Sequence, residues 1–287
     1  MALYLNSAEP MCNGTDSTVL MCDDFERANW YTTDADHGGP GDPDNCGWSG
    51  DVFQTTPAVN VSGGCCGTAT TATSGDRSGA KWQGLHEFGP SANQYAEIYH
   101  RFYTHFSVGY TFGHEKLVFY QKWNADSTNQ VCCFMTPFGS SQFDIQTQVP
   151  DDNRYAQNQG VNLSFTPGHW YYVEVHIKLD TPMGNSTGML EVWADDVGTN
   201  GLGDPGAGTL RLSYSGLNIR TSDSYALGAI WQENWSNATT LTAVGEVYND
   251  QVIVRTQRIG PMGSAPEPPP SGNVTNQIFK PYLRVFQ

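Results

Sequence analysis

The stretch YAEIYHRFYTHFSVGYTFGHEKLVFYQKWN, residues 95–124, decides the fold class, because apolar and polar residues alternate along both of its halves. Successive residues of a β-strand point to opposite faces, so residue parity separates the two faces of a predicted strand. In the first half, the apolar face consists of Ile98, Phe102 and Phe106. The opposite face carries rings and charges: Tyr95, Glu97, Tyr99, Arg101, Tyr103 and His105. This half therefore predicts a strand with one face on a core and the other toward solvent.

The second half predicts another strand of the same kind after a turn at residues 108–113. Its apolar face consists of Leu117, Phe119 and Trp123, and its polar face of Lys116, Tyr120, Lys122 and Asn124. A third alternating segment, residues 142–149, has a polar side with Gln142, Asp144 and Gln146. We expect the first two strands to be neighbours that share one exposed, aromatic and polar face. Such a face favours ligand binding, although a plain solvated sheet face also contains many Tyr and Thr residues.

Positive charge gathers on this face of an otherwise acidic chain. The sequence has 14 Lys and Arg against 29 Asp and Glu, a net charge of -15. Between residues 100 and 122 the balance is reversed, since Arg101, Lys116 and Lys122 stand against Glu115 alone. A cationic site on an acidic protein favours an anionic ligand, because only local cations overcome the repulsive field of the rest of the chain. No basic stripe extends beyond this window, so a nucleic-acid partner is not expected.

Strand patterns also fill the rest of the chain, and no segment has a sustained helical period. Short alternating segments separated by turn residues are typical of β-sandwiches. After an early strand near Leu20, further strands are predicted at residues 80–87, 169–180, 189–195, 210–214, 224–231 and 245–255. We therefore predict a β-sandwich domain with cross-linked N-terminal loops over residues 1–260. A Pro-rich segment and a C-terminal edge strand would follow over residues 261–287.

The cysteine distribution indicates an oxidising compartment. Most of the 7 cysteines lie before residue 67, in a region rich in Gly, Asp and Pro that gains stability from cross-links. We expect disulfides there rather than a zinc site, because no Cys-x2-Cys or Cys–His spacing is present. The expected disulfides favour a secreted protein, extracellular or periplasmic. No signal peptide is visible, and no apolar run is long enough to span a membrane.

Four segments, in this order, resemble the concanavalin-A-like jelly-roll polysaccharide lyases of the alginate and glucuronan lyase families. They are DDFE near the start, YHRFYTHF followed by EKL, the hairpin HWYYVEVHIKLDTPMGNSTGMLEVWAD, and the closing strand EVYNDQVIVRTQRIGP. The resemblance implies a jelly-roll β-sandwich of two curved antiparallel sheets, with the ligand on the concave face.

The resemblance also implies which strands carry the ligand. The two strands of residues 95–124 and the strand at residues 142–149 would line the concave face. The hairpin at residues 169–195 would then be convex, with Glu174 and His176 in structural roles.

The residue types on the expected face suit β-elimination from a uronic-acid polymer better than hydrolysis. Elimination removes the proton at C5, which becomes more acidic when the neighbouring carboxylate is neutralised by Arg, Lys, Gln or Asn. A Tyr or His takes that proton, and a Tyr or His protonates the leaving oxygen. Hydrolysis instead needs a pair of carboxylates. Hydrolases of this fold resemble each other in a strand with the pattern Glu-x-Asp-x-x-Glu. This pattern is absent from the sequence.

Candidate roles follow from these requirements. The predicted catalytic residues are Arg101 with Gln142 or Gln146 as carboxylate neutralisers, His105 as base, and Tyr103 or Tyr120 as acid. The predicted substrate-binding residues are Tyr99, Lys116, Lys122, Asn124 and Asp144. The predicted partner is therefore an acidic polysaccharide, and a polysaccharide lyase is favoured while the enzyme assignment stays open.

A structural Ca2+ ion is implied by the resemblance, and no cofactor is expected for catalysis. Calcium binds oxygen ligands, and Asp24, Glu26 and Asp250 match best. Two other classes of protein remain open. A non-catalytic carbohydrate-binding or lectin-like domain would have the same face without proton transfer. A structural or adhesive surface protein would self-associate through the C-terminal strand at residues 277–287.

Overall fold

The structure is a computed structural model whose regular elements are all β-strands. It describes residues 11, 16–23, 67–69, 82–87, 95–110, 112, 115–122, 130–135, 144–147, 163–199, 206–219, 223, 226–236 and 247–262. The predicted C-terminal strand and the predicted site residues Asp24, Glu26, Asn124 and Gln142 lie outside these residues. In the described part of the chain, no helix is long and apolar enough to cross a membrane.

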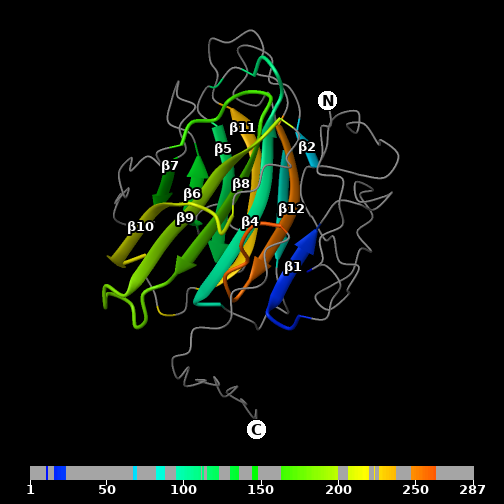
Figure 1. Ribbon diagram of the computed structural model, residues 1–287. Helices are drawn as coiled ribbons and strands as arrows, with labels where there is room; N and C mark the ends of the chain where they lie inside the picture. The colour runs from blue at the N-terminus through cyan, green and yellow to red at the C-terminus, as the bar shows by residue number, and fades with distance from the viewer. Residues whose placement is uncertain are drawn as a thin grey trace.

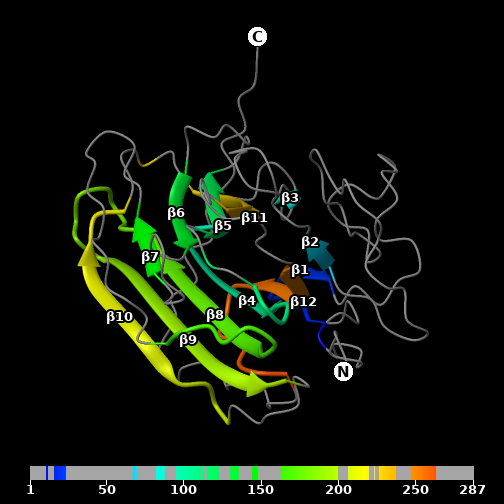
Figure 2. The ribbon, with the colours of Figure 1, turned by 90° about the horizontal axis from the view of Figure 1, so that it is seen from above.

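The strands form two antiparallel sheets that face each other in an all-β jelly-roll sandwich, as predicted (Figures 1 and 2). They are β1 (Val19–Asp23), β2 (Gly67–Ala69), β3 (Trp82–Glu87), β4 (Glu97–Phe106), β5 (Glu115–Lys122), β6 (Gln130–Met135), β7 (Asp144–Thr147), β8 (Trp170–Lys178), β9 (Gly188–Gly198), β10 (Leu210–Leu217), β11 (Leu227–Ser236) and β12 (Val247–Arg255). Sheet A has seven strands in the order β1-β12-β4-β8-β9-β10, with β2 also paired to β12. Sheet B has five strands in the order β3-β11-β5-β6-β7.

The strands predicted from alternation are present, and two further strands escaped prediction. β6 reads QVCCFM, an apolar run without alternation, which periodicity alone does not identify as a strand. β2 reads GTA and is too short to show a period.

β4 and β5 do not lie side by side, which corrects the predicted shared face. β4 pairs with β12 and β8 in sheet A, whereas β5 pairs with β11 and β6 in sheet B. β7, which carries Asp144 and Gln146, also belongs to sheet B. The connection between β4 and β5 is not a tight hairpin, because its rings pack into the core. Tyr110 and Phe112 lie 4.8 and 4.9 Å from the Phe106 ring, and Phe165 lies 4.4 Å from it.

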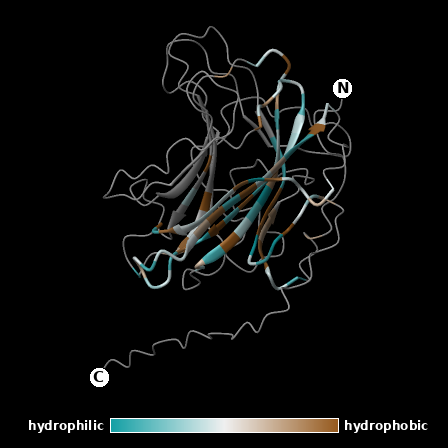
Figure 3. Cartoon of the chain, turned by 60° about the vertical axis from the view of Figure 1, so that its left-hand side comes forward, coloured by the Kyte–Doolittle hydropathy of each residue, from teal (hydrophilic) through white to brown (hydrophobic). Residues whose placement is uncertain are grey.

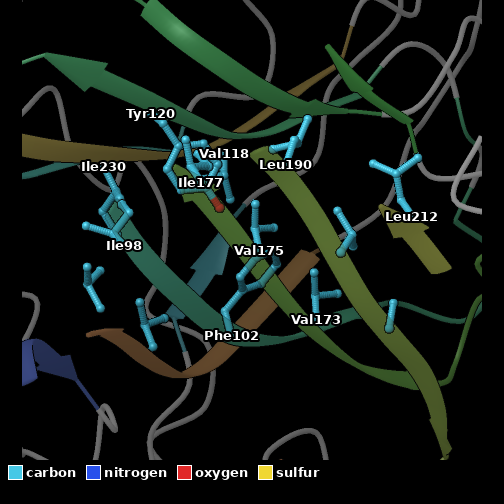
Figure 4. Packing of buried hydrophobic residues seen from close by; sticks show 14 of the residues in the cluster. Ile98, Phe102, Val118, Tyr120, Val173, Val175, Ile177, Leu190, Leu212 and Ile230 are labelled. Carbon is cyan, nitrogen blue, oxygen red and sulfur yellow. The ribbon is translucent and has the colours of Figure 1, made fainter. Parts of the chain in front are cut away.

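The core between the sheets is built from the apolar faces that parity predicts for β4 and β8. Ile98 and Phe102 of β4 and Val173 and Val175 of β8 are fully buried. Figure 4 shows them facing Val118, Tyr120 and Ile230 of sheet B. Hydrophobic and hydrophilic residues alternate along the described strands of sheet A, as Figure 3 shows. The predicted polar side of β4 therefore faces away from sheet B, and we call that side of sheet A its outer face.

His100 and Tyr120 join the two sheets through the core. The Nδ1 atom of His100 lies 2.9 Å from the hydroxyl oxygen of Tyr120, and both side chains are fully buried. Parity predicts Tyr120 on the exposed polar face, but it lies in the core, where its hydroxyl has a hydrogen-bond partner. Burial, with a smaller effect of Arg101, lowers the pKa of His100 to about 3, so its imidazole is uncharged near neutral pH.

The buried His100 should make the protein sensitive to acid. In the unfolded chain its pKa is about 6.5, whereas in the folded protein it is about 3. The unfolded state therefore binds more protons below pH 6.5, and stability that is complete above this pH is lost as the pH falls toward the folded pKa. The free energy of unfolding should fall between pH 7.5 and pH 4.5, and in His100→Gln this fall should be smaller than in the wild type by about 2–3 kcal/mol. Urea denaturation at both pH values measures it.

Val175→Ala is the control for this experiment, because it weakens the same core without removing a titrating group. It should lower the unfolding free energy equally at both pH values. An acid sensitivity that His100→Gln leaves unchanged would contradict a neutral, buried His100.

Candidate functional site

The outer face of sheet A is covered at its centre by the segment that follows β12. This segment, residues 256–262, is called the strap below. The N–H groups of Ile259 and Gly260 donate to the Glu174 carboxylate at 2.7 and 3.0 Å. The N–H group of Met262 donates to the Tyr103 hydroxyl at 2.9 Å. The strap thus binds β4 and β8 mainly through its own backbone groups.

Two predicted catalytic residues, Arg101 and His105, are buried on this face. Arg101 has a relative exposure of 0%, and its guanidinium donates to the carbonyls of Gly260 and Gln251 at 3.3 and 3.4 Å. His105 is 1% exposed, and burial lowers its pKa to about 4. The expectation that these side chains face solvent is therefore wrong. The strap contacts Arg101, and the His105 ring lies 5.2 Å from the Trp170 ring. Their assigned roles in catalysis stay predictions.

On the outer face of sheet A, aromatic residues form a second apolar cluster, separate from the core between the sheets. Its members are Tyr103, Trp170, Tyr172, Trp193 and Val197, with Tyr99 and Met262 packed against them. Gly208 also closes on this cluster, since a Cβ atom there would come within 2.8 Å of the Tyr172 ring. The predicted aromatic face therefore packs as a small core.

The hairpin of β8 and β9 belongs to the same sheet as β4, which corrects the expectation that the hairpin and the strand carrying Arg101 lie in opposite sheets. β8 is the direct neighbour of β4, and the register pairs Arg101 with Glu174 and Tyr99 with His176. The polar residues of β4 and β8 therefore share one face of one sheet. Both cannot lie on opposite sides of the sandwich, as the sequence interpretation requires.

Beside the strap, an ordered polar group remains partly open to solvent, and we call it the Tyr99 network. His176 Nε2 lies 2.9 Å from Glu97 Oε1, and His176 Nδ1 lies 2.8 Å from Glu191 Oε2. The imidazole stacks on the Tyr99 ring at a centroid distance of 4.0 Å and an angle of 3°. Lys178 adds an ion pair of 3.3 Å to Glu97. The network therefore links three neighbouring strands, β4, β8 and β9.

The exposure of the Tyr99 network defines which groups a ligand can reach. His176 is only 3% exposed, whereas Glu97 and Glu191 are 38% and 19% exposed. A carboxylate oxygen lies within hydrogen-bonding distance of each ring nitrogen of His176. The hydrogen bond from His176 is the largest cause that lowers the pKa of Glu97, against the opposing effect of its burial. Carboxylate oxygens are therefore the main exposed acceptors of the network.

Tyr99 is suited to donate a hydrogen bond rather than to remove a proton. Burial raises the pKa of its hydroxyl well above the usual value, and the charges of Glu97, Glu191 and Glu174 raise it further. The phenol therefore stays protonated at neutral pH. Sequence analysis identifies Tyr99 but misses its partners, because only the strand register shows that Tyr99, His176 and Glu191 lie in one row.

The predicted residues of sheet B are separated from this site. Lys116 and Lys122 lie on β5, and Asp144 and Gln146 lie on β7. The side chains of these four residues fall outside the described part of the structure. They belong to the other sheet and cannot share a face with Arg101 or Tyr99.

The predicted calcium ligands can be compared only at Asp250. This carboxylate is fully buried beside an irregularity of β12, where Gln251 has a φ of 54° and donates its N–H to Asp250 Oδ1 at 2.8 Å. Asp23 at the end of β1 pairs with Val252, so the chain that leads to Asp24 starts next to this site. Within the described residues no cluster of three metal-ligating side chains is present.

The two facing antiparallel sheets define a jelly-roll β-sandwich. No protein-family model matches the sequence, and no curated protein matches it. Among solved structures, the chain is similar to the PL-14 alginate lyase from Aplysia kurodai, with a TM-score of 0.46 and 10% identity over 66% of this chain and 87% of that one.

Two further solved structures show the range of this fold. The endo-β-1,4-glucuronan lyase from the fungus Trichoderma reesei has a TM-score of 0.46 and 14% identity over 66% of this chain and 79% of that one. The binding domain of botulinum neurotoxin serotype D/C has a TM-score of 0.40 and 10% identity over 68% of this chain and 44% of that one. The predicted similarity to jelly-roll polysaccharide lyases is therefore found. At such low identity it concerns the fold alone.

The contacts of Glu174 predict its contribution to stability. Its carboxylate accepts hydrogen bonds from two strap N–H groups and from the Tyr172 hydroxyl, at 2.7, 3.0 and 2.5 Å, and it is fully buried. Glu174→Gln replaces one of the two carboxylate oxygens by an NH2 group, which cannot accept a hydrogen bond from the strap N–H groups or the Tyr172 hydroxyl. We therefore expect the free energy of unfolding to fall by about 2–4 kcal/mol. Urea denaturation measures this change. Glu191→Gln, at a partly exposed carboxylate, should cost about 1 kcal/mol or less. Equal costs for both variants would contradict the strap anchor.

Proposed function

We propose that the protein binds a polysaccharide on the outer face of sheet A, at the margin of the strap, through the Tyr99 network. The carrying observation is the arrangement around His176, in which two carboxylates fix the imidazole and the imidazole fixes the Tyr99 ring. Sites of this kind bind with little reordering, because side-chain positions are set before the ligand arrives.

The network has hydrogen-bonding capacity left for sugar hydroxyl groups. A carboxylate has about four lone-pair positions. Glu97 contacts His176 and Lys178, and Glu191 contacts His176 and Ser213. Both carboxylates therefore retain acceptor positions, and the protonated Tyr99 hydroxyl supplies a donor. A hydroxyl-rich chain that both donates and accepts fits these groups.

The finer hypothesis is a secreted polysaccharide lyase that cleaves an acidic polymer by β-elimination. Its support is the set of residue types predicted from the sequence, together with the jelly-roll sandwich. The burial of Arg101 and His105 counts against an open catalytic face at those residues. Elimination and binding are distinguished in one experiment, since only elimination produces an unsaturated, ultraviolet-absorbing uronate.

Binding is tested with a panel of soluble polysaccharides: β-glucan and xylan as neutral chains, and alginate, glucuronan and polygalacturonate as acidic chains. We expect Tyr99→Phe to weaken binding to the best ligand by about two- to tenfold in calorimetry, because it removes one hydrogen-bonding group. Tyr99→Ala should weaken it further. Val108→Ser, at a 71% exposed residue away from the network, is the control that should bind normally.

No binding to any member of the panel, or unchanged binding in Tyr99→Ala, would overturn the proposed site. Absorbance from unsaturated product would establish a lyase, and binding without product a carbohydrate-binding protein.

We also propose a structural Ca2+ ion near the end of β1, held by Asp250 with Asp24 and Glu26. Its support is the place of Asp250, a buried carboxylate two residues before Val252, which pairs with Asp23 at the end of β1. Carboxylate oxygens are the ligands that Ca2+ prefers. If Ca2+ is bound at about a hundredfold excess over its Kd, it adds about 3 kcal/mol of stability. EDTA should then lower the melting temperature, and Ca2+ but not Mg2+ should restore it. Asp250→Asn should abolish this response, whereas a metal-independent melting temperature would exclude the ion.

A further inference from the structure

A second histidine–carboxylate pair, His169 and Asp196, lies at the end of the sandwich and is not part of the Tyr99 network. His169 directly precedes β8, and Asp196 lies near the end of β9, so the antiparallel pairing brings them together. His169 Nδ1 lies 3.0 and 2.8 Å from the two carboxylate oxygens of Asp196. Both side chains are partly exposed, at 32% and 37%.

The Asp196 carboxylate is held by groups other than His169. The N–H group of Gly198 donates to Oδ1 at 2.8 Å, and the Tyr171 hydroxyl donates to Oδ2 at 3.4 Å. Tyr171 is itself fully buried in the core, so it ties the carboxylate to the rigid part of the sandwich. An oriented carboxylate in turn fixes the ring orientation of its histidine.

The backbone before His169 is also fixed. Gly168 donates its N–H to the Phe106 carbonyl at 2.7 Å, and His169 donates its N–H to the Thr166 carbonyl at 3.1 Å. Gly168 has a φ of 89°, in the left-handed region that favours glycine, and a Cβ atom there would come within 3.1 Å of the Val108 side chain. This close turn sets the position from which the imidazole reaches Asp196.

One ring nitrogen of His169 remains available for chemistry. The carboxylate accepts from Nδ1–H, so the neutral ring carries its lone pair on Nε2. Among the described residues, Nε2 of His169 has no hydrogen-bond partner. The contrast is His176, whose two ring nitrogens both contact carboxylates and whose side chain is 3% exposed.

The neighbouring imidazole adds no positive charge beside His169. Burial, together with a smaller effect of His169 itself, lowers the pKa of His105 to about 4, so His105 is uncharged near neutral pH. The charged group in contact with His169 is the carboxylate of Asp196.

We propose that His169 and Asp196 form a proton-transfer site that hydrolyses carboxylic esters, with His169 Nε2 as the general base. Nε2 takes one proton from a water molecule while the water oxygen bonds to the acyl carbon. The bond from the acyl carbon to the alcohol oxygen then breaks, and that oxygen leaves with the electron pair and takes the proton back from the imidazolium. The products are a carboxylic acid and an alcohol, and the imidazole returns to its starting state.

The ester class follows from what the pair offers. The site supplies a base on one nitrogen and, after proton uptake, an acid on the same nitrogen. Ester hydrolysis uses both in sequence, because the attacking water loses a proton and the leaving alcohol gains one. A pair that only links β8 to β9 would need neither the open Nε2 nor its exposure to solvent.

The test uses p-nitrophenyl acetate as the ester and diethyl pyrocarbonate as the histidine label, both with the full chain. We expect the wild-type protein to hydrolyse the ester faster than an equal concentration of free imidazole. His169→Gln should lower this rate by about 10²-fold. Asp196→Asn should lower it by about tenfold or more, because the ring can then adopt the wrong tautomer.

Matched controls separate chemistry from folding. Asp223→Asn changes an exposed carboxylate that accepts from the N–H of Met183 at the turn end of the hairpin, and it should leave the rate unchanged. Peptide mass spectrometry should show faster labelling of His169 than of His176 in the same wild-type sample. Melting temperatures of all variants report on structure.

The proposal is overturned if the wild type does not exceed free imidazole, or if His169→Gln keeps the wild-type rate. It is also overturned if Asp196→Asn leaves the rate unchanged, or if His169 is labelled no faster than His176. A purely structural pair predicts lower melting temperatures in both variants with no change in the rate.

Discussion

The Glu174 carboxylate holds the strap on sheet A, and the arrangement of the whole outer face depends on that contact. Two consecutive strap N–H groups and the Tyr172 hydroxyl converge on it. A buried carboxylate is costly unless hydrogen bonds and nearby charge compensate it. Its cross-strand neighbour Arg101 supplies a positive charge on the same face. With the strap in place, Arg101 in turn donates to Gly260, so the strap links both charges.

Because the strap is in place, the central strands of sheet A are buried on both sides. β4 and β8 contribute one set of side chains to the core between the sheets and another to the cluster of Tyr103, Trp170 and Tyr172. Figure 2 shows sheet B on one side of these strands, and the hydrogen bonds of residues 259–262 place the strap on the other. Within the described part of the chain, Glu97 and Lys178 are exposed on this face beside the strap.

How far the sequence predicts this structure depends on the range of each signal. Parity along one strand is local, so the two faces of β4 and β8 could be predicted correctly. The choice of neighbouring strand is not local. The chain passes to the other sheet between β4 and β5, and Tyr110 of this connection packs on Phe106. The strap binds through backbone N–H groups, which every non-proline residue carries, so no side-chain pattern predicts its position. The Tyr99 network and the pair of His169 and Asp196 require the register of the β8–β9 hairpin, which single-strand patterns do not contain.

The charges of the outer face also bear on which polymer could bind there. Among the described residues of this face, Lys178 pairs with Glu97 and Arg211 with Asp195. Arg258 lies over the Trp193 ring at 4.5 Å, and its guanidinium donates to the carbonyl of Ala207. A chain of net charge -15 with a charge-balanced face offers an acidic polymer little electrostatic attraction. For the proposed binding role, recognition of sugar hydroxyls by fixed carboxylates and a protonated tyrosine therefore fits this face better than recognition of uronates.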